Sequence, residues 1–230
     1  RDQPRSRGLG DVYKRQSIYK PVGWTSFDVV NKIRFITKEK KVGHGGTLDP
    51  FAEGVLIIGT GKDTKRLQNI SNNTKSYEAK LVLGAKTDTL DNEGKIIENK
   101  IIPDLEISKI VSVLRSFVGD YNHLPPMYSA KKVNGTRLYK LARKNKTIKR
   151  DPILSNISEM KLIEYTKNII EFSVTCSKGT YVRVLGSDIA NNLGTVGYLD
   201  KLIRTNVGTF NIADTIKIKD FEKQWKSIAN

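Results

Sequence analysis

The chain has 230 residues, 38% of them hydrophobic, which is enough for one large domain with a buried core. Its 40 Lys and Arg residues against 24 Asp and Glu give a formal net charge of +16, so nucleic acid is the expected partner, although a lysine-rich proteome would also produce such a charge. One cysteine and two histidines exclude an internal disulfide and a structural zinc site, and no apolar stretch has the length of a membrane span. We therefore expect a metal-free protein of the reducing cytoplasm, without membrane contact.

The first sixteen residues, RDQPRSRGLGDVYKRQ, show neither strand nor helix periodicity, and they lack an initiator methionine and the apolar core of a signal peptide. They look like a translated remnant of a sequencing adapter. We therefore predict a non-native segment at residues 1–16 and one domain at residues 17–230. The segment carries five basic and two acidic side chains, so the net charge is still about +13 without it and nucleic acid remains the expected partner.

The first predicted elements are two strands and a helix. Residues 17–23, SIYKPVG, predict a short strand that a proline and a glycine interrupt. Thr25 and Ser26 can cap a helix over 25–39, whose apolar side chains keep helical spacing. Residues 54–59, GVLIIG, are an unbroken apolar run of strand length, which favours a strand buried on both faces.

A hairpin is predicted next. Residues 76–84, SYEAKLVLG, alternate between apolar and polar side chains, as in a half-exposed strand. The turn sequence DNEG at 91–94 leads into a second strand, KIIENKII, at 95–102, and pairing of these two consecutive strands is the simplest arrangement. Residues 107–119 then predict a helix that a glycine ends.

The second half of the chain mixes strand and helix patterns without a regular βαβ order. Residues 136–145 predict a short basic helix, and residues 168–177 predict a strand. Residues 182–193 carry apolar side chains at helical spacing, and residues 202–212 again resemble a strand. We therefore expect an α+β fold with a mixed, largely antiparallel central sheet and flanking helices.

Three familiar motifs fit the sequence less well. GTGKDTK at 59–65 lacks the glycine and the Ser or Thr that a phosphate-binding loop places around its Gly-Lys pair. DTLDNEG at 88–94 lacks the carboxylates that a calcium loop needs at its first and twelfth positions, so we interpret it as a turn. Asp49 and Glu53 could form an acid/base pair of the glycosidase kind, but Pro50 between them leaves their separation undetermined.

One loop favours catalysis more strongly. Residues 43–50, GHGGTLDP, contain three glycines, a histidine, and Asp49 directly before a proline. Glycine permits positive φ and close approach of another backbone or a flat ring, and proline biases the residue before it away from the helical region. Such a loop holds one side chain rigidly, and an aspartate is ionised at neutral pH and can be a nucleophile without a partner base. A lone loop aspartate is more often a turn former, so both roles stay open at this point.

Several long segments, in one order, resemble the TruB family of tRNA pseudouridine-55 synthases. The resemblance runs from Ser17 to Phe210, and because it rests on several long motifs it is far more specific than a single glycine pattern. The segments are KPVGWTSFDVVNK, GHGGTLDPFAEGVLIIGTGKDTK, KSYEAKLVLGAKTDTLDNEG, LPPMYSAKKVNGTRLYKLAR, CSKGTYVRVLGSDIANNLG and LIRTNVGTF.

The resemblance implies an isomerase that converts a uridine at position 55, in the T arm of tRNA, to pseudouridine. It implies a bacterial, cytoplasmic enzyme that flips the target base out of the stack and needs no cofactor and no metal. The domain at 17–230 would be the catalytic domain of the pseudouridine synthase fold. The expected partner is the T-arm stem-loop of tRNA rather than DNA, and a monomer is expected.

The resemblance also assigns roles to individual residues. Asp49 matches the catalytic aspartate, which attacks either C6 of the uracil or the anomeric carbon of the ribose. Tyr77 matches the tyrosine that stacks on the base and assists proton removal, and Arg183 matches the arginine that pairs with the catalytic carboxylate and keeps it ionised. The remaining matches are to positions that line the uridine pocket or contact RNA: His44, Tyr181, Leu202 and Lys20.

Two departures and two alternatives accompany this prediction. About twenty residues follow Phe210, too few for the C-terminal PUA domain that is common in the family, so we expect a short form or a clipped sequence. Gly45 stands where the family often has threonine.

Two alternative functions would share the basic charge: a non-catalytic RNA-binding or RNA-folding protein on the same fold, and a general nucleic-acid coat protein. The intact set of Asp49, Tyr77 and Arg183 argues against the first, although alone Tyr77 would be a core residue and Arg183 a solvated charge. A coat protein would have no need of the glycine loop.

Overall fold

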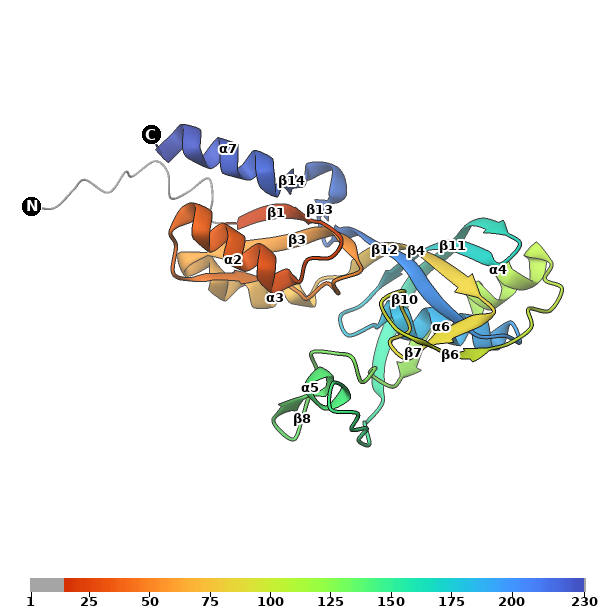
Figure 1. Ribbon diagram of the computed structural model, residues 1–230. Coiled ribbons are helices and arrows are strands. Elements are labelled where there is room, and N and C mark those ends of the chain that lie inside the picture. Colours follow the sequence, from red (N-terminus) through yellow and green to blue (C-terminus); the bar gives the residue numbers. More distant parts are fainter. Residues whose placement is uncertain (1–14, 230) are drawn as a thin grey trace, which may run out of the picture. The chain divides into compact units, whose positions relative to one another are not determined.

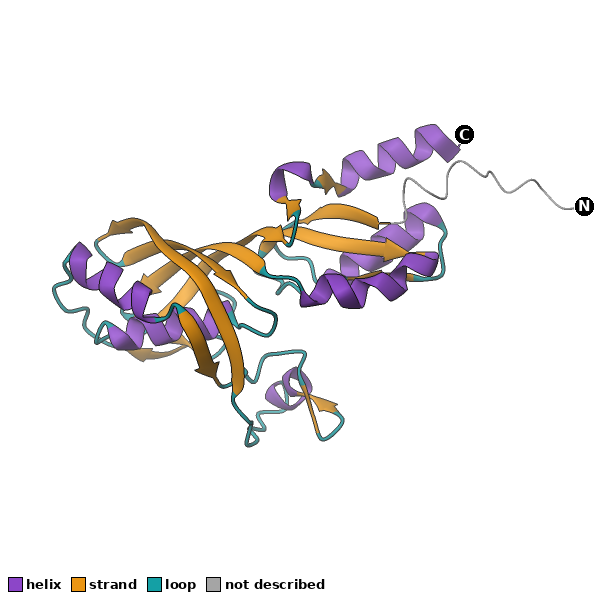
Figure 2. Cartoon of the chain, turned by 180° about the vertical axis from the view of Figure 1, so that it is seen from behind, coloured by secondary structure: helices purple, strands orange, loops and turns teal. Residues whose placement is uncertain are grey.

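The computed structural model describes residues 15–229, and these divide into two compact units (Figure 1). Unit 1 contains the described residues up to Asn73 and those from Arg204 onward, and unit 2 contains Thr74–Ile203. Each unit combines strands with helices, as Figure 2 shows, so the predicted α+β class is confirmed. The single domain at 17–230 stays a prediction, and residues 1–14 of the predicted non-native segment lie outside the described residues.

The strands of unit 1 belong to a mixed sheet and follow the order β14, β1, β3 and β12, with β2 beside β3 and β13 beside β12. Strand β12 belongs to unit 1 from Arg204 onward. Strands β1 and β3 are antiparallel, whereas β1 and β14 are parallel. The strand bounds are β1 (Arg15–Lys20), β2 (Val42–His44), β3 (Glu53–Thr60), β12 (Gly197–Val207), β13 (Phe210–Asn211) and β14 (Ile216–Lys217).

The central strand of unit 1 is buried on both faces, as its apolar sequence predicts. Leu56 and Ile58 face a cluster that α2 and α7 complete, whereas Val55 and Ile57 face a second cluster with α3. Alternate side chains of one strand therefore supply two cores. The helices of unit 1 are α2 (Ser26–Thr37), η1 (Gly61–Arg66), α3 (Leu67–Asn72), η2 (Ile212–Asp214) and α7 (Ile218–Ala229).

Unit 2 is built on antiparallel pairs, with the strand order β12, β4, β11, β10 and β7. Its strands are β4 (Lys75–Leu83), β5 (Ala85–Thr87), β6 (Ile96–Asn99), β7 (Gly119–His123), β8 (Lys132–Val133), β9 (Thr136–Arg137), β10 (Ile153–Thr166) and β11 (Ile169–Cys176). Its helices are α4 (Ile107–Ser116), α5 (Leu138–Ala142) and α6 (Val182–Asn192).

Two local predictions are corrected by long-range pairing. The predicted hairpin of 76–84 with 95–102 is wrong, because β4 pairs with β11 and the chain turns at Gly84, whose φ is +91°. The hairpin instead joins β5 to β6. The basic helix predicted at 136–145 is shorter, because Thr136 and Arg137 pair with β8 as strand β9. Strand β10 and helix α7 were not predicted.

No helix among residues 15–229 is long and apolar enough to cross a membrane.

We expect Thr25→Ala to lower the free energy of unfolding by about 1 kcal/mol. Thr25 caps α2 with a complete capping box, in which its hydroxyl accepts from the Asp28 amide at 3.1 Å and the Asp28 carboxylate accepts from the Thr25 amide at 2.8 Å. Urea unfolding of the two proteins measures the difference. Thr25→Ser keeps the acceptor and should unfold like the wild type; an equal loss in both variants would assign the effect to the threonine methyl group.

Candidate active site

Asp49 lies half-buried in the loop between β2 and β3, at the first position of a turn. The Ala52 amide donates to the Asp49 carbonyl at 3.2 Å, and Pro50 takes the second turn position, for which its fixed φ is suited. On the other side, the Leu48 amide donates to the Ser26 hydroxyl at 2.8 Å, and that hydroxyl donates to the Leu48 carbonyl at 3.1 Å. The backbone is therefore fixed on both sides of the aspartate.

Two of the loop glycines are required for different reasons. Gly46 has a φ of +143°, which side chains rarely permit. Gly45 has ordinary backbone angles, but a Cβ there would lie 3.0 Å from Cγ2 of Ile70 in α3. The predicted need for glycine thus holds for backbone conformation at one position and for close packing at the other.

Two other predicted residues lie close to this loop. Lys20, at the end of β1, is fully buried, and its ammonium donates to the carbonyls of Pro21, Trp24 and Pro50 at 2.9, 2.6 and 3.3 Å. His44 ends β2, and its Nδ1 accepts from the Gly46 amide at 3.4 Å.

The protonation of His44 is set by its surroundings. Burial and the positive charge of Arg204 lower the pKa of the imidazole, outweighing the Gly46 amide contact, which acts in the opposite direction. His44 is therefore a neutral imidazole at physiological pH, able to stack or to exchange single hydrogen bonds.

The other predicted residues lie in unit 2. Tyr77 is on β4, opposite Val174 of β11, and is 9% exposed. Tyr181 is the N-cap residue of α6, which brings Arg183 into the first turn of that helix. Leu202 is buried in β12. The structure thus groups Tyr181 with Arg183; the pairing of Arg183 with Asp49 stays a prediction.

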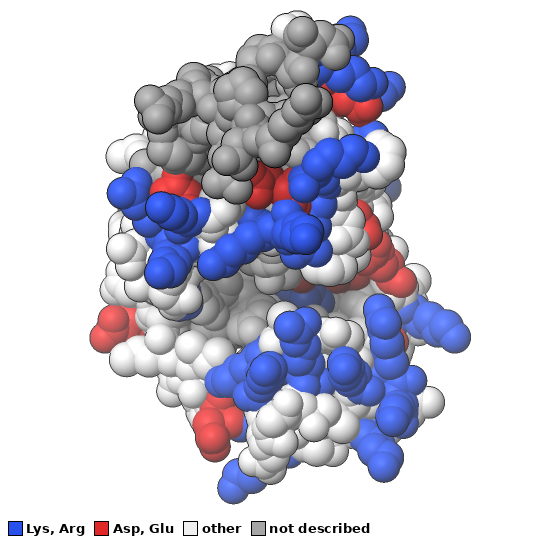
Figure 3. Space-filling model, turned by 90° about the vertical axis from the view of Figure 1, so that its left-hand side faces the viewer, with Lys and Arg blue, Asp and Glu red and all other residues white. Residues whose placement is uncertain are grey.

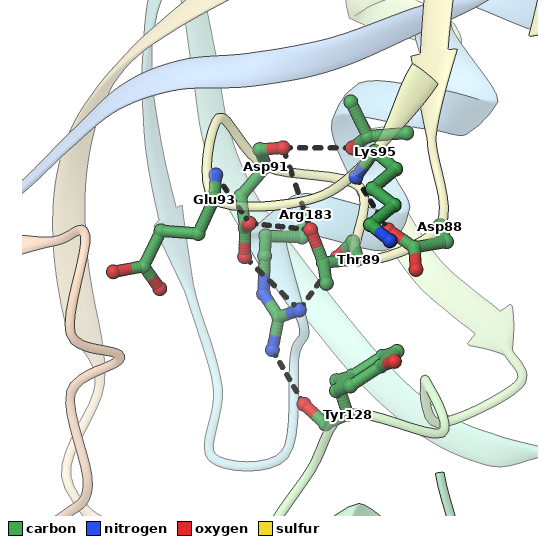
Figure 4. Close-up of polar contacts among 8 residues, drawn as sticks. Asp88, Thr89, Asp91, Glu93, Lys95, Tyr128 and Arg183 are labelled. Atoms are coloured by element: carbon green, nitrogen blue, oxygen red, sulfur yellow. Dashed lines mark hydrogen bonds and ion pairs between the residues drawn. The ribbon is translucent and has the colours of Figure 1, made fainter. Parts of the chain in front are cut away.

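Arg183 is held in a buried network that sequence reasoning missed (Figure 4). Its Nη1 donates to the Thr89 carbonyl at 2.6 Å and lies 3.3 Å from the Asp91 carboxylate, and its Nη2 donates to the Tyr128 carbonyl at 2.8 Å. The Arg183 side chain is 4% exposed and that of Asp91 is 5% exposed. The alternative interpretation of Arg183 as a solvated charge is therefore wrong, and its catalytic role stays a prediction.

Asp91 is held by its own turn. Its Oδ1 accepts from the Thr89 hydroxyl at 2.5 Å and from the Glu93 amide at 3.1 Å, and its carbonyl accepts from the Thr87 hydroxyl at 2.7 Å. The sequence DTLDNEG is thus a turn, as predicted, but it is one that presents a buried carboxylate to an arginine. No pattern among the neighbouring residues indicates this network, because Arg183 bonds carbonyls that lie 94 and 55 residues away in the sequence.

Tyr181 lies at the end of a row of aromatic side chains in unit 2. His123 stacks on Tyr121 at 4.6 Å between ring centroids and meets the Tyr181 ring edge-on at 5.9 Å. The Tyr121 hydroxyl donates to the Asp188 carboxylate at 2.5 Å, and the Tyr181 amide donates to His123 Nε2 at 3.4 Å. His123 is 4% exposed, so this row is part of the core that supports the start of α6.

In the view of Figure 3, Lys and Arg side chains cover more of the surface than Asp and Glu side chains do. One hollow in unit 2 has a polar and basic lining that includes Lys132, Arg137, Tyr139 and Lys140.

Glu53, which the sequence analysis considered as an acid partner of Asp49, accepts a hydrogen bond from the Tyr19 hydroxyl at 2.7 Å. Burial and this contact raise the pKa of Tyr19 to about 12. Among the described residues, no group of three His, Cys, Asp or Glu side chains is placed to hold a metal ion.

Comparison with known proteins places this loop and these strands in a family. Residues 34–182 match the model of the TruB family pseudouridylate synthase N-terminal domain. The chain belongs to the TruB family of pseudouridylate synthases. A tRNA pseudouridine synthase B of Clostridium tetani is 44% identical over 208 residues, which are 90% of this chain and 72% of that protein. One of Dehalococcoides mccartyi is 41% identical over 206 residues, 90% of this chain and 69% of that protein.

Solved structures agree with the family. The crystal structure of a Cbf5-Nop10-Gar1 complex contains a chain with a TM-score of 0.74 and 27% sequence identity, covering 94% of this chain and 56% of that one. A structure of an H/ACA RNP bound to a substrate RNA matches with a TM-score of 0.69 and 25% identity, covering 94% and 55%. The chain thus spans somewhat more than half of these structural relatives. The predicted family, the pseudouridine synthase fold and the isomerase class are confirmed.

In this TruB family member we expect Asp91→Asn to lower the free energy of unfolding by about 3–5 kcal/mol, because it leaves the buried Arg183 charge without its carboxylate. Urea unfolding measures the loss. Asp88→Asn is the matched control, since Asp88 is an exposed residue of the same turn that accepts from the Lys95 amide at 2.9 Å. Equal losses in the two variants would show that the turn, and not the buried ion pair, is what the substitution disrupts.

Acid should destabilise the protein through His123. Burial is the main cause that lowers the pKa of His123, and Lys131 acts in the same direction, while Asp188 and the backbone at 121 and 179 oppose it. The unfolded chain therefore takes up a proton near pH 6.5 before the folded one does, so stability falls as the pH drops through that value, by at most about 1.4 kcal/mol per pH unit for one histidine.

Urea unfolding between pH 7.5 and 5.5 measures this dependence, and the stability of His123→Gln should depend on pH less steeply. A slope that the substitution leaves unchanged would contradict the assignment.

Proposed function

We propose that this TruB family member converts the uridine at position 55, in the T arm of tRNA, to pseudouridine with Asp49 as the nucleophile. The observation that carries the proposal is the loop of Asp49, in which Ser26 bonds the amide and carbonyl of Leu48 before the aspartate, and Gly23 and Lys20 bond the carbonyl of Pro50 after it. A carboxylate carried on a backbone that is fixed in this way needs little reorganisation when it reacts. Its position in a segment that matches the family makes this loop the candidate catalytic loop.

The proposed reaction rearranges atoms within one nucleotide. The bond between N1 of the uracil and the ribose anomeric carbon breaks, the ring turns, and a bond forms between C5 and that carbon. N1 gains a proton and C5 loses one, so no electrons are gained or lost and no cofactor is needed. Asp49 attacks either C6 or the anomeric carbon and leaves again when the new bond has formed.

Tyr77 and Arg183 are the proposed partners of Asp49. Tyr77 would stack on the flipped uracil and assist removal of the C5 proton. Arg183 would hold the Asp49 carboxylate ionised while it remains bonded to Asp91 and to two carbonyls. An arginine suits this task because its planar fork can serve several acceptors at once.

Four further residues are proposed to form the substrate site. Tyr181 and Leu202 would line the uridine pocket, His44 would contact the RNA as a neutral imidazole, and Lys20 would shape the wall of the pocket through its bonds to Trp24 and Pro50. Extrusion of a stacked base costs a few kcal/mol, which aromatic stacking and contacts of basic side chains with phosphates can offset. We further propose that the protein acts as a monomer in the cytoplasm.

The decisive experiment is tritium release from a tRNA transcript labelled at C5 of uridine. We expect about one equivalent of release per tRNA from the wild type and none from Asp49→Asn, which should bind tRNA as tightly as the wild type because the loop keeps its shape. Glu53→Gln is the matched control. Glu53 lies four residues after Asp49 in the sequence and accepts a hydrogen bond from Tyr19, and the activity of the variant should equal that of the wild type.

Either of two results would contradict the proposal. Full activity of Asp49→Asn would show that Asp49 is not the nucleophile. Tight tRNA binding by the wild type without any release would favour the non-catalytic RNA-binding alternative on the same fold.

A further inference from the structure

Arg204 is among the largest fully enclosed side chains of the molecule, with 2% of its surface exposed. Its Nε donates to the Val55 carbonyl at 2.7 Å, its Nη1 to the Thr47 carbonyl at 3.2 Å, and its Nη2 to the Gly46 carbonyl at 3.2 Å. Burial of a guanidinium costs several kcal/mol unless its donors are satisfied, so a site with three carbonyl acceptors is built for it.

These three carbonyls lie on both sides of Asp49 in the sequence. Gly46 and Thr47 precede the aspartate in the loop, and Val55 follows it in β3. One guanidinium therefore joins the two ends of the segment 46–55. The loop leaves the β2–β3 ladder after His44, so its carbonyls have no ladder partner there, and Arg204 supplies the donors that a neighbouring strand would otherwise supply.

The backbone of Arg204 is fixed at the same place by an independent contact. A Cβ at Gly54, whose φ is +108°, would lie 2.3 Å from the Arg204 carbonyl oxygen. Only glycine permits both that conformation and that approach. The strand that carries Arg204 and the end of the loop are thus packed backbone against backbone, which aims the arginine side chain at the loop.

We propose that Arg204 is the positioning residue of the catalytic loop. It holds residues 46–55 closed so that the Asp49 carboxylate stays at a fixed place, and it does not itself touch the substrate. This inference rests on the proposed role of Asp49. A lysine at 204 would keep the charge but, with its point-like ammonium, could not serve three separated carbonyls in a planar fork. A displacement of about 1 Å at a reacting group can cost on the order of 100-fold in rate.

The test compares Arg204→Lys with the wild type by three readouts: kcat and KM for tritium release, tRNA affinity, and hydrogen exchange of the loop amides. We expect kcat to fall about 100-fold, with KM and tRNA affinity changed less than about threefold, and the Leu48 amide to exchange faster. Arg34→Lys is the matched control, because Arg34 also donates to a backbone carbonyl of unit 1, that of Val42 at 3.1 Å, but not to the loop. Its kcat should not change.

The failures of the two proposals are distinguishable. If the wild type releases no tritium, the proposed function fails, and exchange of the Leu48 amide still decides the role of Arg204: faster exchange in Arg204→Lys supports it. An Arg204→Lys protein with kcat within threefold of the wild type, or with unchanged exchange at Leu48, overturns it. If the variant does not fold, Ser26→Ala decides, because it removes the direct acceptor of the Leu48 amide and leaves Arg204 in place. Continued protection of that amide then supports a segment closed by Arg204, and exchange as fast as in an open loop contradicts it.

Discussion

The candidate site depends on how the backbone of the loop between β2 and β3 satisfies its hydrogen bonds. A loop of this kind cannot use the sheet ladder, and an unpaired buried carbonyl costs as much as a lost hydrogen bond. Here the partners are side chains: Lys20 and Ser26 bond the peptides next to Asp49, and Arg204 bonds the two ends of the segment. Buried cations are costly, but carbonyl dipoles in a medium of low dielectric constant compensate them.

Unit 2 uses the same device. Arg183 is bonded to the carbonyls of Thr89 and Tyr128 and also meets the carboxylate of Asp91, so its position is fixed before any substrate arrives. The carboxylate in turn is fixed by the hydroxyl and amide groups of its own turn. Each unit therefore contains a candidate catalytic residue, Asp49 in unit 1 and Arg183 in unit 2. The position of each is fixed by hydrogen bonds to backbone groups outside helices and strands. Preorganisation of this kind is a major source of rate enhancement in enzymes.

Local patterns predicted the elements whose stability is local. The Thr25 cap of α2, the doubly buried β3, the alternating β4 and the apolar spacing of α6 all follow from neighbouring residues, and all are present. The hairpin after β4 was misplaced because the partner of β4 is β11, whose paired residues lie 87 (Val82 with Ile169) to 101 (Lys75 with Cys176) positions later in the chain. Helix α7 was missed although Ile218, Phe221 and Trp225 keep helical spacing in the sequence; in the structure Phe221 and Trp225 pack on the cluster of α2.

The sequence by itself determined the family and the identity of the candidate catalytic residues. Several family motifs occur in one order and contain these residues, and the glycine-rich loop before Asp49 is visible in the amino-acid sequence. Only the tertiary structure decided what holds those residues. Arg183 bonds a carbonyl 94 residues away and Arg204 one 149 residues away, and Asp91 became a buried partner instead of an exposed turn residue. The physical reason is that a backbone carbonyl has no sequence signature. Which donor reaches it is decided when strands distant in the chain come together.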